Sequence, residues 1–252
     1  PSNAKNYKVV NGALLSRDGT ILYAQTSDLG GGTYTVPAGV TTIGSYAMCN
    51  NATFSKIVLP QGLARMEQYC LYGTAIQSLD MPDSVTCVQG YICSNCNQLR
   101  SVRISNNVAE LGECAGWECF FSCPNLASVT LGSSLRTIGN ACFAGSAITS
   151  IDLPSSLVQI NYGAFGDCKQ LARVTGGQNL KYIYRYAFRY APITGFPFGS
   201  DLRFVSNEAF FGCGFTPSYP SYLDEQPDGY YKYDGTLSVE AQVSYSKAFE
   251  VL

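Results

Sequence analysis

Apolar residues along the middle of the chain recur with a period of 22 or 23 residues. A turn-forming residue, which we use as an anchor, marks each repeat, and three residues and one residue before it lie apolar pairs such as Ile57 and Leu59. This alternation predicts a short strand with one buried face. Six residues after each anchor another apolar residue follows, as at Ile160. The anchors are Pro37, Pro60, Pro82, Ser105, Gly132, Pro154, Gly177 and Gly199, at spacings of 23, 22, 23, 27, 22, 23 and 22.

The return side of each coil has its own apolar signature. A small residue followed by a large one stands ten and eleven residues after the anchor, as in Ala164-Phe165. One coil buries only a thin stripe and cannot offset its ordering entropy, whereas stacked coils form a continuous core. Proline or glycine at the anchor ends the strand and turns the chain. The pattern therefore predicts a β-rich solenoid of about eight coils.

Several copies of the repeat resemble a known family. The strings Ile138-Gly139-Asn140-Ala141-Cys142-Phe143 and Ala164-Phe165-Gly166-Asp167-Cys168-Lys169-Gln170-Leu171, followed by Val174, resemble the BspA-like class of leucine-rich repeats of bacterial surface proteins. The resemblance covers Tyr34 to Phe215 and implies a leucine-rich-repeat right-handed superhelix with a parallel sheet on its concave side. It also implies an exported or surface-attached protein that functions in adhesion. Gly176, in place of a buried apolar residue, and the fourth coil depart from the pattern.

The two ends of the chain lack the period, and we expect them to cap the solenoid. Residues 1–33 comprise a tail and a hairpin, since Val9–Ala24 contains two strand-like runs joined at Asp18-Gly19. Such a hairpin would cover the open edge of the first coil. Residues 34–215 form the solenoid. Residues 216–252 hold three prolines and an Asp234-Gly235 turn, and we expect an irregular C-terminal cap or tail.

Composition limits the chemistry of the chain. Charged residues make up 13% of it and the net charge is −2, which gives no reason to expect a nucleic-acid partner. No apolar run is long enough to predict membrane insertion. The chain has no histidine, so the commonest general base and metal ligand is missing. We therefore expect a non-enzymatic protein with no catalytic residue, no cofactor and no metal.

The eleven cysteines allow three interpretations. Four of them share one position in the repeat, fourteen residues after the anchor, if the four-residue insertion in the fourth coil is not counted. This shared position favours a buried ladder of small apolar thiols. A disulfide among Cys114, Cys119 and Cys123 is an alternative in an oxidising compartment. Zinc or redox chemistry at Cys93-x-x-Cys96 together with Cys114, Cys119 and Cys123 is a third, although only one pair has the spacing usual for zinc. The cysteines of the ladder are Cys96, Cys123, Cys168 and Cys213.

Two further features have both a functional and a structural interpretation. The fourth coil carries an insertion with the single tryptophan, Trp117, which is either a contact loop or a tolerated insertion whose Phe120-Phe121 restores the core pair. Four tyrosines stand nine residues after their anchors, where they either stack on a ligand or stiffen the return side. These tyrosines are Tyr46, Tyr69, Tyr91 and Tyr186.

The outward positions of the strands before the anchors form the main predicted binding surface. These positions, four and two before each anchor, are polar and short-chained with scattered charge of both signs, as repeat sheets that bind partners often are. We expect an extracellular or cell-surface module that recognises a protein or glycan there, and a structural spacer without a ligand is the alternative. The oligomeric state stays open. Candidate contacts are Lys56, Ser78, Asp80, Ser101, Arg103, Ser128, Thr130, Ser150, Asp152 and Arg173, together with Trp117.

Overall fold

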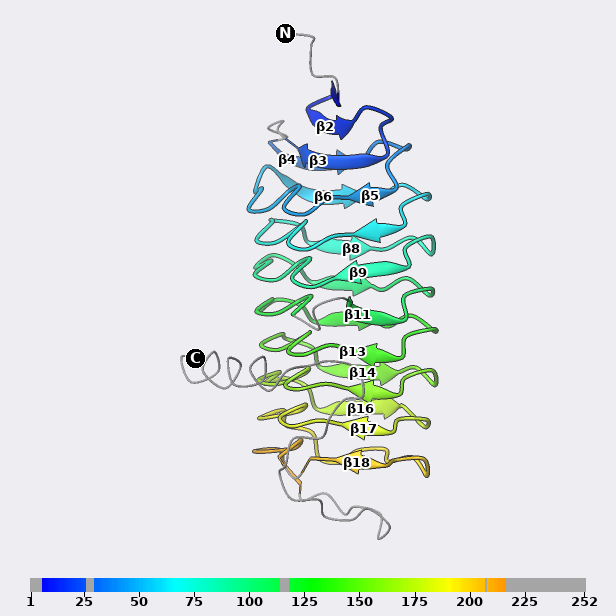
Figure 1. Cartoon of the computed structure of the whole chain (residues 1–252). Coiled ribbons are helices and arrows are strands. Elements are labelled where there is room, and N and C mark those ends of the chain that lie inside the picture. Colours follow the sequence, from blue (N-terminus) through cyan, green and yellow to red (C-terminus); the bar gives the residue numbers. More distant parts are fainter. Residues whose placement is uncertain (1–5, 26–29, 114–117, 207, 216–252) are drawn as a thin grey trace, which may run out of the picture.

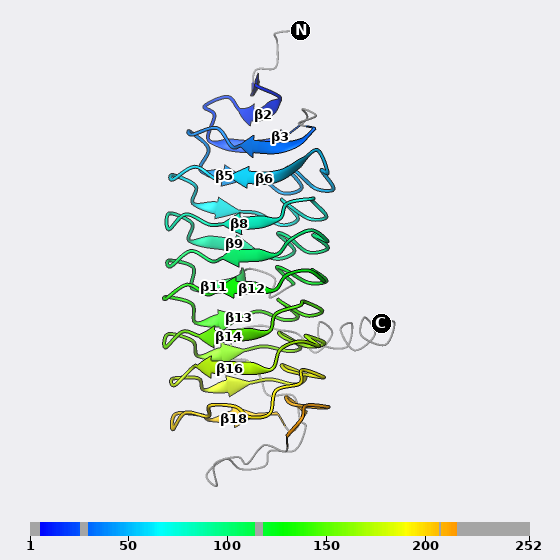
Figure 2. The same cartoon turned by 180° about the vertical axis from the view of Figure 1, so that it is seen from behind.

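Strands are the only regular elements in the part of the chain that the structure describes. The computed structural model describes residues 6–25, 30–113, 118–206 and 208–215. Its coils lie one above another along a single axis (Figures 1 and 2). The predicted solenoid of about eight coils is therefore confirmed, and no described helix is long and apolar enough to cross a membrane.

The longest sheet runs through the segments that follow the anchors. Its repeat strands pair in parallel, each with the strand of the next coil, so that Ile43 lies beside Met66 and Ile138 beside Ile160. The sequence indicated only a buried residue at this place, so these strands were missed. They are β5 (Thr42–Ile43), β7 (Arg65–Met66), β9 (Cys87–Gln89), β11 (Glu110–Glu113), β13 (Thr137–Ile138), β15 (Gln159–Ile160), β17 (Tyr182–Ile183) and β18 (Phe204–Val205).

The strands before the anchors, in contrast, form three short sheets: β4 with β6, β8 with β10 and β12, and β14 with β16. The continuous sheet that we expected on this side is therefore interrupted in two places. The strands are β4 (Gly31–Thr35), β6 (Phe54–Val58), β8 (Ser78–Asp80), β10 (Ser101–Arg103), β12 (Ser128–Thr130), β14 (Ser150–Leu153) and β16 (Arg173–Gly176).

The breaks between these short sheets coincide with the shorter coils. Strands pair across anchor spacings of 23 and 27 residues, and pairing stops between β6 and β8 and between β12 and β14, where the spacing is 22. The missing residue lies in the corner that leads into the strand. With a shorter corner, the strand begins later along the chain. One hydrogen bond between the two coils remains just before β8, from the Gln77 N–H to the Ser55 carbonyl oxygen (N···O 2.9 Å). The segment from the anchor to the long sheet has one length in every coil, so that sheet is not interrupted.

The N-terminal end is two hairpins rather than the one that we predicted. The turn at Asp18-Gly19 joins β2 (Ala13–Ser16) to β3 (Ile21–Gln25), as expected. A second turn at Asn11-Gly12, with φ of 49° and 76°, joins β1 (Tyr7–Val10) to β2. An Asn-Gly pair is a strong signal for a two-residue hairpin turn, so the sequence contained this information. β3 pairs in parallel with β5, so the hairpins extend the long sheet over the first coil.

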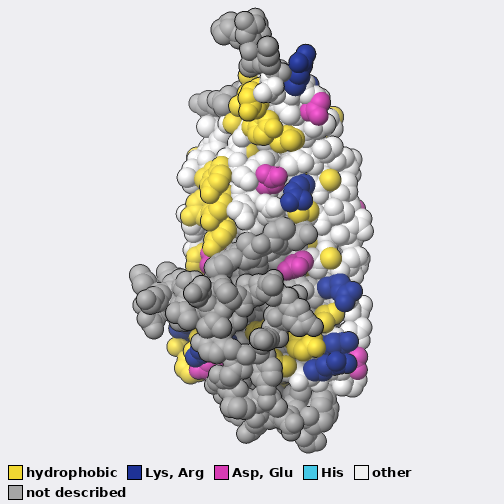
Figure 3. Space-filling model, viewed as in Figure 1, with side chains coloured by type: hydrophobic (Ala, Val, Ile, Leu, Met, Phe, Trp, Pro, Cys, Tyr) yellow, Lys and Arg dark blue, Asp and Glu magenta, His cyan; other side chains and the backbone are white. Residues whose placement is uncertain are grey.

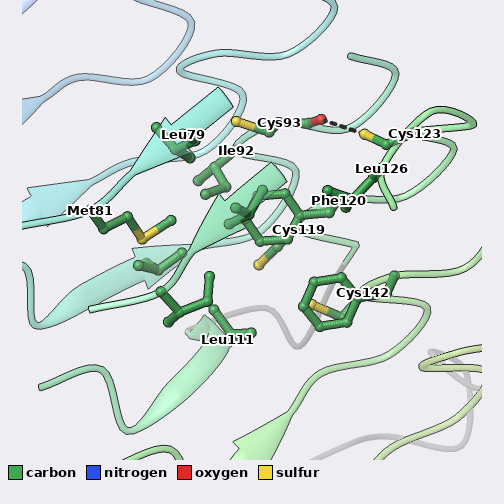
Figure 4. Close-up of a cluster of buried hydrophobic side chains, with 14 of the residues drawn as sticks. Leu79, Met81, Ile92, Cys93, Leu111, Cys119, Phe120, Cys123, Leu126 and Cys142 are labelled. Atoms are coloured by element: carbon green, nitrogen blue, oxygen red, sulfur yellow. Dashed lines mark hydrogen bonds between the residues drawn. The ribbon is translucent and has the colours of Figure 1, made fainter. Parts of the chain in front are cut away.

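Columns of equivalent side chains make the core. The phenylalanine column, eleven residues after the anchors once the insertion of the fourth coil is discounted, stacks face to face with successive ring centroids 5.3 to 5.4 Å apart. In the fourth coil Cys119 and Phe120 fill the small and large positions (Figure 4), not Phe120 and Phe121 as expected, and both are fully buried. The phenylalanine column consists of Phe120, Phe143, Phe165, Phe188 and Phe210.

The predicted buried cysteine ladder is confirmed for Cys96, Cys123 and Cys168, whereas Cys213 in the last coil is only partly buried. Each thiol of the ladder bonds to a backbone carbonyl of the preceding coil, as Cys123 Sγ does to Cys93 O at 3.1 Å (Figure 4). The equivalent contacts of Cys96, Cys168 and Cys213 measure 3.1, 3.2 and 3.0 Å. Burial raises the pKa of Cys168 to about 11, so this thiol stays protonated.

The alternative interpretations of the cysteines are not supported where the structure describes them. The ten described cysteines are free thiols, so Cys119 and Cys123 do not form a disulfide with each other, and Cys114 lies outside the described residues. Within the described residues no three acidic, cysteine or histidine side chains gather as a metal site would require.

Gly176 departs from the repeat for a steric reason. Its φ is +77°, and a Cβ there would lie 2.1 Å from the carbonyl oxygen of Leu153 in the coil before it. A side chain is therefore excluded where other coils place an apolar residue.

Candidate functional site

The strand face comprises the outward-pointing side chains of β6, β8, β10, β12, β14 and β16, and it contains ten of the eleven predicted contacts. All ten are exposed or half-exposed. The parallel register lines them up across coils, so that Ser78, Ser101 and Ser128 form one row. A second row contains Asp80, Arg103 and Thr130. The eleventh predicted contact, Trp117, lies outside the described residues.

Of the other predicted contacts, the structure pairs only Ser150 with Arg173. Asp152 lies beside Thr175, which is not a predicted contact and whose hydroxyl donates a hydrogen bond of 2.8 Å to the Asp152 carboxylate. Lys56 lies on β6, in the first of the three short sheets. The predicted contacts therefore fall into separate groups, one for each short sheet.

Arg103 is held by its own chain. Its guanidinium donates to Asp80, to the carbonyl oxygen of Met81 and, at 3.1 Å, to Asp83. The backbone N–H of Asn106 and then Arg103 lower the pKa of the Asp83 carboxyl. Arg103 therefore contributes to local structure, and a reversal of its charge would disturb the corner after β8 as well as any ligand. Asp152 is the cleaner position at which to test binding.

The tyrosine column, Tyr46, Tyr69 and Tyr91, is a second candidate surface. Neighbouring rings stack almost parallel, with centroids 4.8 and 4.6 Å apart and interplanar angles of 4° and 5°. Tyr46 is 60% exposed, whereas Tyr69 and Tyr91 are half-buried. Hydrophobic side chains gather along this edge of the solenoid in the upper half of Figure 3. The stacked, half-buried rings of Tyr69 and Tyr91 agree with the structural interpretation, whereas ligand stacking at the exposed Tyr46 stays a prediction.

Glu118 occupies the place in the fourth coil that corresponds to the tyrosine column. Burial raises the pKa of the Glu118 carboxyl to about 7. Burial also raises the pKa of Tyr91, and the negative charge of Glu118 raises it further. Its backbone N–H donates to Asn140 O at 2.9 Å. The sequence showed no sign of this residue, because the insertion hides its alignment with the tyrosines.

The fourth predicted tyrosine, Tyr186, belongs to a different cluster near the last coils. The guanidinium carbons of Arg185 and Arg189 lie 4.6 and 5.3 Å from the centroid of its ring. Tyr190 and the exposed Phe211 pack edge to face at 5.6 Å beside it. Arg185 is also paired with Glu208. Unlike the tyrosine column, this cluster places cations over aromatic rings.

A cavity of about 390 Å³ lies at the N-terminal end of the strand face. Uncharged residues line it, among them Val10, Tyr34, Pro37 and Val58. The buried Tyr34 hydroxyl has no hydrogen-bond partner among the described residues, and burial raises the pKa of Tyr34 to about 12. No sequence pattern indicates this cavity, because it forms only where the first hairpin turn meets two coils.

Comparison with known proteins places this geometry in a family. Residues 32–117 and 116–216 match the family described as "BspA type Leucine rich repeat region", in six copies. A leucine-rich repeat protein from Eubacterium ventriosum is similar over 92% of the chain, with 22% identity and a TM-score of 0.63. The leucine-rich repeat protein of T. pallidum is similar over 76% of the chain and 90% of its own length, with 17% identity and a TM-score of 0.58.

These structural similarities support the fold alone, given the low identities. The chain spans 56% of the length of the Eubacterium ventriosum protein. Among curated proteins, none matches the chain.

Proposed function

The chain belongs to the BspA-type leucine-rich repeat family, and from this premise we propose that it is a non-enzymatic recognition module at the cell surface. In this proposal it binds an extracellular protein or glycan through the strand face. The observation that carries the proposal is the register of that face, which repeats short polar side chains in rows from coil to coil.

The row Ser78, Ser101 and Ser128 is suited to contact because its members are short and exposed or half-exposed. Short hydroxyl side chains lose little conformational entropy on binding and leave the backbone of the strands accessible. Adjacent strands lie about 4.8 Å apart, so a partner that crosses the coils meets the same chemistry at each step. Repeat proteins commonly bind along such extended surfaces.

A structural spacer that carries other domains away from an envelope is the alternative function. A spacer needs the stacked core but makes no demand on the strand face. The two functions therefore differ in what a bulky charge on that face would do.

The test compares two matched threonines on opposite sides of the coil. Thr130 lies on the strand face and Thr137 lies in the long sheet, seven residues further along the same chain segment. The purified chain is screened on arrays of glycans and extracellular proteins, and the hits are measured again with Thr130→Arg, Asp152→Lys and Thr137→Arg. We expect the first two variants to lose binding at least tenfold and the third to keep it. Retention of binding in all three variants would exclude the strand face, and a blank array would favour the spacer.

A further inference from the structure

We propose that the tyrosine column and the polar side chains beside it form a binding site for neutral glycans. This site lies apart from the strand face. This inference rests on the proposed function in one respect, that the chain is a recognition module. It assigns a class of partner to the tyrosine column, which has no role in the proposed function.

The backbone at the three tyrosines has an unfavourable conformation. Tyr46, Tyr69 and Tyr91 have φ of 60°, 58° and 61°, in the left-handed region that suits glycine. Two later coils place Ala141 and Gly163 at the same point of the repeat, also at positive φ, so the fold itself does not need a tyrosine there. Bulky residues rarely adopt this conformation, and such outliers gather at functional sites.

Among the described residues each end of the stack has a ring face that no other ring covers, and the end at Tyr91 is half-buried near Glu118. Both faces of Tyr69 are occupied by its neighbours, but among the described residues Tyr46 meets only the ring of Tyr69. With 60% of its surface exposed, Tyr46 offers a flat apolar face at the N-terminal end of the column. The C–H face of a pyranose ring can stack on such a surface, while the phenol hydroxyl remains available for a sugar hydroxyl.

The surroundings of the column favour a neutral polar ligand. Ser45, directly before Tyr46, and Asn50, four residues after it, are exposed, and Gln68 precedes Tyr69. Hydroxyl and amide groups of this kind both donate and accept hydrogen bonds, as sugar hydroxyls require. A peptide anchored by an apolar side chain would instead need an apolar pocket.

The charges near the column argue against an acidic glycan. Glu67 accepts hydrogen bonds from Ser45 and lies 3.7 Å from Arg65, so that cation is already paired. Glu118 adds a second carboxyl at the other end of the column.

The experiment measures binding of defined oligosaccharides to the full chain by titration calorimetry and affinity electrophoresis. The neutral probes are cellohexaose, laminarihexaose and chitohexaose, and the acidic probe is a hyaluronan hexasaccharide. We expect at least one neutral probe to bind, a loss of at least tenfold in Tyr46→Ala, and a smaller loss in Tyr46→Phe, which keeps the ring. Tyr190→Ala is the matched control, because Tyr190 is also exposed and has φ of 56° but lies outside the column, and it should bind as the parent does.

Four outcomes would overturn the proposal: no binding of any neutral probe, stronger binding of the hyaluronan probe, equal binding by Tyr46→Ala, or a Tyr46-dependent peptide hit on a peptide array in place of a glycan. Thermal unfolding of each variant shows that a loss of binding is not a loss of fold. Thr130→Arg and Asp152→Lys are titrated with the same probes. If these strand-face variants lose glycan binding and Tyr46→Ala does not, the recognition function stands and the tyrosine site fails.

Discussion

Two aromatic columns follow the return side of this solenoid, and they differ in what holds them in place. The phenylalanine column of Phe120 to Phe210 is at most 5% exposed and extends without a gap through the last five coils. The tyrosine column of Tyr46 to Tyr91 is partly exposed, has left-handed backbone and stops after three coils. Burial requires a large apolar side chain in each coil, whereas an exposed corner accepts glycine, alanine or tyrosine. The comparison shows that the core preserves the fold and that the tyrosines need another explanation.

The largest effect is expected from a break in the buried column. Phe143→Ala should lower the free energy of unfolding by about 3–5 kcal/mol, because it leaves a cavity between Phe120 and Phe165. Phe143→Leu should cost less than about 1.5 kcal/mol, since Leu71 fills the same position in the second coil. Urea titration followed by circular dichroism measures both. Equal losses in the two variants would show that ring stacking, rather than volume, determines the stability of the column.

A smaller effect should come from the carboxyl that ends the tyrosine column. The pKa of Glu118 is raised from 4.5 to about 7 in the folded chain, so between these pH values the folded state binds more protons than the unfolded state. Stability should therefore fall as pH rises from 4.5 to 7, by about 2 kcal/mol after allowance for the exposed part of the side chain. Glu118→Gln should remove this slope and be more stable than the parent at pH 8. If the unfolding free energies of the two proteins changed with pH in the same way, the burial of this carboxyl would be contradicted.

Backbone strain in the tyrosine column gives a third prediction. At the φ of 58° of Tyr69, glycine is favoured over alanine, so Tyr69→Gly should be more stable than Tyr69→Ala by about 1 kcal/mol. The control is Tyr182 in β17, where extended backbone should make the glycine variant the less stable of the two. Thermal unfolding of the four variants measures the two differences. The same order at both positions would mean that the column is not strained.

The strand face should give the smallest change in stability. Asp152→Lys replaces an exposed side chain whose described partner is the hydroxyl of Thr175, so its unfolding free energy should stay within about 0.5 kcal/mol of the parent. Arg103→Glu should cost more, because it also breaks the contacts to Asp80 and Asp83. If denaturation shows the opposite order, the Arg103 contacts contribute little to the fold.

The candidate binding surfaces followed from the sequence less completely than the fold did. The outward positions of the strand face were correct, because alternation in a strand determines which side chains point away from the core. The internal contacts of Arg103 were not foreseen, since they depend on the corner that brings Asp83 and Asn106 beside it. The exposure of the outermost ring, Tyr46, also depends on stacking between coils. The cavity beside Tyr34 arises where the hairpin turn meets the first coils, and no local pattern encodes that meeting.

The sequence by itself determined the repeat, its anchors, the buried positions and the cysteine ladder. These follow from which residues avoid water, and that preference is written at a fixed spacing along the chain. Only the tertiary structure decided where backbone pairing continues and where it stops. The long sheet joins segments of constant length, and each 22-residue coil interrupts the shorter sheets, because hydrogen bonds between coils depend on the alignment of backbones that lie more than twenty residues apart.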